Sequence, residues 1–151
     1  MTVTSLRAQE NVEDSRWETA VRCIKKYEGW HGPEHHPYVA YGHRIRKGEK
    51  FPATLTESEG DSILRKDLKE MCALFRHLGK DSLLVACLAY QVGPYRLLGY
   101  ARMPKSTLIR KLEAGNRDIY ADFIRYCHYK GKKILSIERR RKEEYRLLFM
   151  P

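Results

Sequence analysis

One carboxylate in the sequence occupies a position where it could donate or accept a proton in a reaction. Glu28 comes at the end of an apolar, helix-like stretch, between Tyr27 and the pair Gly29 and Trp30. A carboxyl group at a helix C-terminus faces the negative end of the helix dipole, and neighbouring aromatic surface removes water from it. Both effects raise the pKa of a carboxyl group, as a general acid near neutral pH requires. Glu28 is therefore the first candidate catalytic residue, although an ordinary solvated glutamate would have the same local sequence.

A loop rich in glycine, proline and histidine follows directly. It contains one further carboxylate, Glu34, and the adjacent imidazoles of His35 and His36. A carboxylate or a neutral histidine can act as the general base that activates water. The same histidines, together with His31 and His43, could also be zinc ligands. This cluster has no accompanying cysteine, and we expect neither a metal nor a cofactor.

Two tyrosines alternate with apolar residues just after this loop. Residues 38–41 read Tyr-Val-Ala-Tyr and predict a short strand of a small hairpin or three-stranded sheet, with a turn at Gly42. One face of such a strand could present Tyr38 and Tyr41 to a sugar ring, and Trp30 could stack on a sugar in the same way. Packing of these rings in a protein core would give the same pattern.

The elements that must position these groups are mainly helical. Apolar residues at steps of three and four predict a helix over residues 13–29, with Asp14 or Ser15 as its N-cap. A capping box at Thr56 opens a second helix. Residues 83–92 are apolar on nearly all sides, which predicts a buried central helix. Three shorter helices are predicted after it, over residues 106–115, 116–129 and 136–149.

Composition bounds the class of protein. The chain has 151 residues and a formal net charge of +10, and 42% of its residues are hydrophobic, enough for a packed core. No apolar run approaches the roughly 18–20 residues of a bilayer span, which excludes an integral membrane segment. The positive charge predicts a polyanionic partner such as nucleic acid, anionic lipid or an anionic cell-wall polymer. We expect a flexible segment over residues 1–12 and a single, predominantly helical α+β domain over residues 13–151.

The cysteines indicate little about the compartment. None of the four forms a CxxC pair, and each lies within an apolar helical pattern, as expected of buried free thiols. One or two disulfide bonds are the alternative for Cys23, Cys72, Cys87 and Cys127.

The order of these motifs resembles that of the phage-type lysozymes. Glu28 and Gly29, a short loop and a strand ending Tyr-Gly-His are similar to that family's Glu-Gly and its Thr-Ile-Gly-Tyr-Gly-His strand. The sequence Leu-Ala-Tyr-Gln-Val-Gly is similar to the family's central helix, which usually ends Asn-Val-Gly. Later segments resemble its polar helix, glycine turn and Arg-Arg-x-x-Glu helix. The resemblance covers residues 17–149, through segments 28–43, 88–93, 106–115 and 131–144.

The resemblance implies a fold and an activity. The fold is lysozyme-like, with a small β element, a helical lobe around the buried helix and a cleft between lobes. The activity is cleavage of the β-1,4 bond between N-acetylmuramic acid and N-acetylglucosamine in peptidoglycan, with Glu28 as the acid. Gly42 and His43 would be structural residues near the site, and Gln91 would face the cleft. We expect a monomer that acts in the periplasm or is secreted, although no complete signal peptide is visible.

The chain departs from the family in the catalytic loop. Members usually have an aspartate about nine positions after the glutamate and a threonine about six further on. This chain has no aspartate between Glu28 and His43, and Tyr38 stands at the threonine position. Three interpretations remain open for this shortened loop. The base is Glu34, or the base is one of the two histidines His35 and His36, or the protein binds glycan with altered or lost hydrolysis.

A nucleic-acid-binding domain is the least favoured interpretation. The basic run at residues 139–142 is followed by Glu143 and Glu144, so i to i+4 ion pairs can neutralise it along a helix. No interleaving of aromatic and basic residues and no helix-turn-helix pattern accompanies it. We therefore expect peptidoglycan, and no nucleic acid, as the partner.

Overall fold

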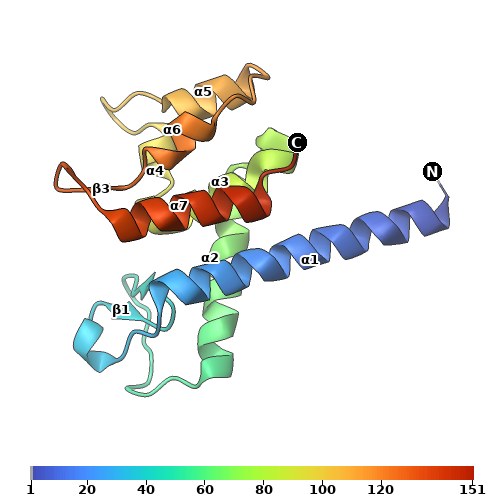
Figure 1. The fold of residues 1–151 in the computed structure, drawn as a ribbon. Helices are drawn as coiled ribbons and strands as arrows, with labels where there is room; N and C mark the ends of the chain where they lie inside the picture. Colours follow the sequence, from blue (N-terminus) through green and yellow to red (C-terminus); the bar gives the residue numbers. More distant parts are fainter. Residues whose placement is uncertain (1) are drawn as a thin grey trace. The chain divides into compact units, whose positions relative to one another are not determined.

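The structure, a computed structural model, describes residues 2–151, apart from the side chains of residues 13 and 14. The chain divides into two compact units, one ending at Glu70 and the other beginning at Met71. Helices dominate, and each unit adds one two-stranded antiparallel sheet (Figure 1). The predicted α+β, mostly helical architecture is confirmed. No helix within residues 2–151 is both long and apolar enough to cross a membrane.

The first unit begins with the long helix α1, Val3–Glu28. The hydroxyl of Thr2 caps it by accepting a hydrogen bond from the Ser5 amide at 3.3 Å. The predicted start at Asp14 or Ser15 was therefore wrong. Residues 3–12 lack apolar periodicity, but a helix needs an apolar stripe only where it packs, and this stretch is exposed. The flexibility of residues 1–12 stays a prediction.

A small β element follows α1. The 3-10 turn η1, Pro33–His35, leads into β1, Tyr38–Val39, which pairs with β2, His43–Arg44. An additional bridge joins His31 to Ala40. The predicted hairpin is confirmed, although its strands are only two residues long.

The helix α2, Glu57–Leu74, begins at the predicted capping box. The Thr56 amide donates to the Glu59 carboxylate at 3.0 Å, and the Glu59 amide donates back to the Thr56 hydroxyl at 3.1 Å. Within the first unit this helix crosses the C-terminal half of α1 (Figure 1), where Lys25 pairs with Asp61 at 2.6 Å. These contacts fix the segment between the two helices, which carries the candidate site.

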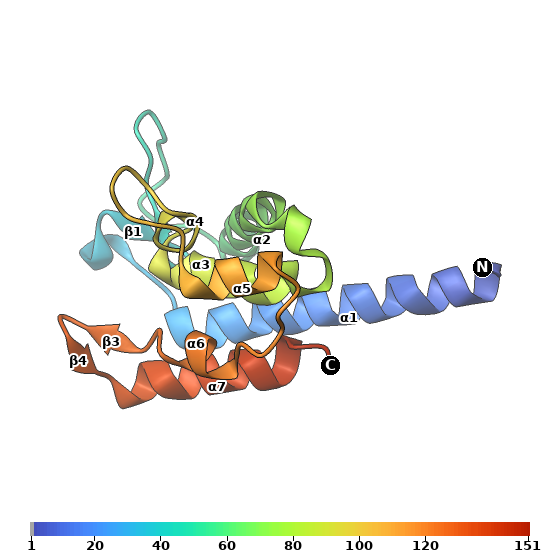
Figure 2. The ribbon, with the colours of Figure 1, turned by 90° about the horizontal axis from the view of Figure 1, so that it is seen from above.

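The second unit is built around α3, Ser82–Val92, whose residues 83–89 are all buried. The predicted central helix is thus confirmed. The helix α7, Leu135–Leu148, packs against it and against α6, Tyr120–Ile124. The remaining elements, which can be followed in Figure 2, are η2 (Arg76–Asp81), α4 (Tyr95–Leu98), α5 (Thr107–Glu113), β3 (His128–Tyr129) and β4 (Lys132–Lys133).

One local prediction for the second unit needs correction. The helix expected over residues 116–129 is reduced to α6, and its end is replaced by the hairpin of β3 and β4, which sequence reasoning missed. The strands of this hairpin are exposed and consist of His, Tyr and two Lys, so no apolar alternation marks them.

All four cysteines are free thiols, and burial raises the pKa of Cys72 to about 11.

Candidate active site

Glu28 is the last residue of α1, as its sequence context predicts. Gly29 ends the helix with a positive φ of 66°, and its amide donates to the Lys25 carbonyl at 3.0 Å. Glycine adopts positive φ without the steric cost that a side chain brings. The chain therefore turns away immediately after Glu28 and leaves its half-buried carboxylate at the end of the helix.

The Glu28 carboxylate lies directly against the backbone of Gly42. A Cβ atom placed on Gly42 would be 2.8 Å from Oε2 of Glu28 and 3.2 Å from its carboxyl carbon. Gly42 also has a φ of 90°, which disfavours any other residue. The Glu-Gly and Tyr-Gly-His motifs, separated in sequence, thus meet in one contact that leaves no room for a side chain.

His43 anchors the strand that carries this glycine. It is buried, with Nδ1 at 2.6 Å from the Asp67 carboxylate on α2 and Nε2 at 2.9 Å from that of Glu49. Burial raises the pKa of Asp67, whereas the hydrogen bond from His43 lowers that of Glu49. Both imidazole nitrogens are therefore occupied, and the geometry gives His43 a structural role.

Glu34 and His35 contact each other on the surface of η1. The Glu34 side chain is 69% exposed, and its carboxylate lies 3.3 Å from Nδ1 of His35. It also folds over Gly32, where an added Cβ would be 2.6 Å from Oε2 of Glu34. The Gly32 amide donates to the same Nδ1 of His35 at 3.1 Å. The lone pair of Nδ1 thus already accepts a hydrogen bond within the loop.

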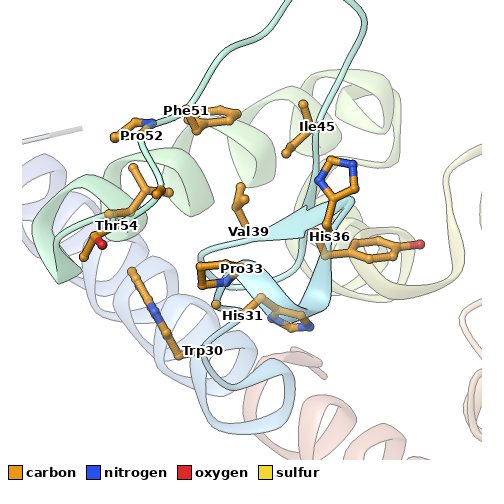
Figure 3. Close-up of a pocket in the computed structure, with 13 residues that line it drawn as sticks. Trp30, His31, Pro33, His36, Val39, Ile45, Phe51, Pro52 and Thr54 are labelled. Carbon is orange, nitrogen blue, oxygen red and sulfur yellow. The ribbon is translucent and has the colours of Figure 1, made fainter.

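Trp30, His36 and Tyr38 line a cavity of about 360 Å³ in the first unit (Figure 3). Its walls come from residues 30–39 and 45–55. The side chains are mostly apolar or aromatic, with two imidazoles and two hydroxyl groups among them, a composition suited to one face of a sugar. The other wall residues are His31, Gly32, Pro33, Val39, Ile45, Phe51, Pro52, Ala53, Thr54 and Leu55.

Sequence reasoning missed the wall formed by residues 51–55 and the contact that positions Trp30. The Trp30 ring packs against Gly60 on α2, where an added Cβ would be 2.5 Å from Cζ3 of the indole. Its ring also meets that of Tyr41 edge-on, with centroids 5.2 Å apart. A glycine inside a helical pattern indicates close packing, and Gly60 was the one available signal for this contact.

Two of the predicted binding residues are not among those that line this cavity. The Tyr41 hydroxyl donates to the Glu57 carboxylate at 3.0 Å, and the Lys25 ammonium lies 5.2 Å from its ring centroid, so it belongs to a polar cluster with α2. Gln91 is in the second unit, where its amide oxygen accepts a hydrogen bond from Arg141. Within the described residues, no group of three or more His, Cys, Asp or Glu side chains is arranged to hold a metal.

Comparisons with known proteins agree with this architecture. The family model described as phage lysozyme matches residues 24–144. The muramidase domain of SpmX from Asticaccaulis excentricus is a similar solved structure, with a TM-score of 0.68 and 19% sequence identity. The match covers 88% of this chain and 96% of that domain. No curated protein matches the sequence.

Proposed function

Because the chain belongs to the phage lysozyme family, we propose that it is a muramidase that hydrolyses the β-1,4 bond between N-acetylmuramic acid and N-acetylglucosamine in peptidoglycan. One observation carries the proposal, the packing of the Glu28 carboxylate against Gly42 at the end of α1. A peptidoglycan substrate would place the protein in the cell envelope or outside the cell. Its net charge of +10 would attract it to an anionic wall.

Glu28 acts in this proposal as the general acid that protonates the leaving glycosidic oxygen. A glycosidase acid must be held still and shielded on one side, while its proton remains able to reach the scissile bond. Gly42 provides the fixed surface on one side of the carboxylate, and the half-buried position leaves another side accessible. Trp30 and Tyr38 in the cavity wall would stack on sugar rings.

His36 is the favoured group for activating water. Glu34 and His35 contact each other and Gly32, whereas His36 lines the cavity. A neutral imidazole can accept the proton that water loses. His36→Gln should slow hydrolysis about 100-fold or more. The same change at His35 is the matched control and should slow it less than about tenfold.

The role of Glu28 as the general acid can be tested by comparing how fast wild type and Glu28→Gln clear a peptidoglycan suspension. Loss of a general acid should slow clearing about 100-fold or more. Glu10→Gln, at an exposed position of α1, makes the same chemical change and should clear like wild type. Equal clearing by Glu28→Gln and wild type would show that Glu28 is not the acid.

Peptidoglycan binding without hydrolysis is the second candidate function. It is favoured by the loop itself, because the one carboxylate between Glu28 and His43 is exposed and folded onto Gly32 and His35. In that case wild type would sediment with insoluble peptidoglycan yet release no soluble fragments. Trp30→Ala should weaken the sedimentation under either function, because both use the aromatic cavity.

A further inference from the structure

The second unit contains a cavity of about 380 Å³ that the proposed chemistry does not use. It lies where the end of α3, the short helix α4, the residue after α6, strand β3 and the first turn of α7 come together. Most of its lining side chains are polar. They are Gln91, Val92, Arg96, Arg125, Tyr126, His128, Tyr129 and Ile137.

Two arginines in this lining are left without a partner. Among residues 2–151, neither Arg96 nor Arg125 forms a side-chain hydrogen bond or an ion pair. Arg117 of the same unit, by contrast, is paired with Asp81 at 2.8 Å. Guanidinium groups match the geometry of carboxylates and phosphates, so two of them in one concavity favour an anionic ligand.

The carboxylates around the cavity do not neutralise these arginines. Asp122, on α6, is held by Lys111 at 2.7 Å. Glu138, in the first turn of α7, pairs with both Lys133 and Lys142. Each negative charge therefore already has its own cation, and the cavity keeps a net positive charge. Such a concave, positively charged surface concentrates anions near it.

The neutral groups of the lining add donors. Arg141 is fully buried and can only donate, so its bond to Gln91 must use the amide oxygen and leaves the Gln91 NH₂ as a donor. Tyr126 and Tyr129 contribute hydroxyl groups. Ile134, the cap residue of α7, offers no side-chain acceptor to the positive end of that helix.

We propose that this cavity binds an anionic oxygen group of the cell-wall polymer, either a carboxylate of a stem peptide or a phosphate. The proposal rests on the proposed function for the identity of the polymer. It adds a specificity site that would select wall material carrying such groups. A second, smaller hollow shares Arg96, Arg125 and Tyr126, so the positively charged surface continues beyond the first cavity.

The test measures binding by calorimetry in the Glu28→Gln variant, so that the result does not depend on hydrolysis. The probes are a soluble muropeptide with free carboxylates, the same muropeptide with its carboxylates amidated, and inorganic phosphate. Arg96→Gln and Arg125→Gln should each weaken binding of the free-carboxylate muropeptide or of phosphate roughly tenfold. Arg76→Gln, an exposed arginine outside the cavity, is the control and should bind like the parent.

The pattern across probes identifies the source of the anion. Loss of affinity on amidation assigns the site to a carboxylate, and tight phosphate binding with no effect of amidation assigns it to a phosphate. The proposal is overturned if both arginine variants bind all three probes like the parent, or if Arg76→Gln loses as much affinity. Failure of the muramidase proposal is separate, because it would appear as absent turnover by the protein with an intact Glu28.

Discussion

The Glu28 carboxylate rests on the α-carbon of Gly42, so closely that a Cβ atom on Gly42 would be 2.8 Å from Oε2. The last residue of α1 and the turn before β2 are thereby fixed to each other, fourteen positions apart in sequence (42 − 28 = 14). A carboxylate held in this way has fewer orientations to lose when it meets a substrate.

Gly42→Ala should therefore both lower the stability of the fold and slow hydrolysis. Positive φ costs a residue with a side chain about 1–2 kcal/mol, and the new methyl group would in addition displace the Glu28 carboxylate. We expect clearing of peptidoglycan to slow at least about tenfold, since small displacements of a catalytic group are costly. Denaturant unfolding and the clearing assay measure the two effects.

Gly48→Ala is the matched control for this substitution. Gly48 has a similar φ of 86°, but an added Cβ would meet nothing within 4 Å. It should lose a comparable backbone contribution of about 1–2 kcal/mol and keep its hydrolytic rate. If Gly42→Ala retained full activity at the same cost in stability, the close contact would have no part in positioning Glu28.

Gly60→Ala tests how Trp30 is held in the cavity wall. Alanine is favoured over glycine inside a helix by about 1 kcal/mol, but its methyl group would be 2.5 Å from the Trp30 ring. Because the indole is 41% exposed, we expect the ring to move rather than the helix to unfold. Tryptophan emission should shift and glycan binding should weaken, with little net change in stability.

Ser62→Ala, on an exposed position of the same helix, is the control for Gly60→Ala. It changes the helix without touching Trp30 and should leave emission and binding as in wild type. Unchanged emission in Gly60→Ala would show that the packing of Trp30 on Gly60 does not determine the shape of the cavity.

Arg65→Gln should reduce the acid sensitivity of the first unit. The Arg65 guanidinium bonds to Glu18 at 2.7 Å and 2.9 Å and to Asp61 at 2.7 Å. These bonds lower the pKa of Glu18, and Asp61 has a lowered pKa chiefly through Lys25 and further through Arg65. A carboxyl group with a lowered pKa stabilises the fold above its ordinary pKa and loses that contribution as the pH falls through the lowered value.

The expected result is a lower unfolding temperature at pH 7 and a smaller further decrease between about pH 5 and pH 3 than in wild type. Lys69→Gln, which removes one positive charge from an exposed position of the same helix, should keep the wild-type slope. Parallel curves for wild type and Arg65→Gln would contradict a role of this cluster in acid unfolding.

Elements with strong local signals could be predicted from the sequence. The capping box of Thr56 and Glu59 forms as predicted, because both hydrogen bonds lie within four residues. The central helix follows from its apolar composition alone. The hairpin of β3 and β4 could not be predicted, since its exposed Lys and His residues pair through the backbone and leave no pattern in the side chains.

The sequence by itself determined the helical periodicity, the positive charge, the family resemblance and the choice of Glu28, because these depend on residue types and their spacing along the chain. Only the tertiary structure decided which groups meet. It placed Gly42 beneath the Glu28 carboxylate, turned Glu34 toward His35, and left Arg96 and Arg125 unpaired in one cavity. Such contacts depend on how distant segments pack, and one-dimensional spacing does not carry that information.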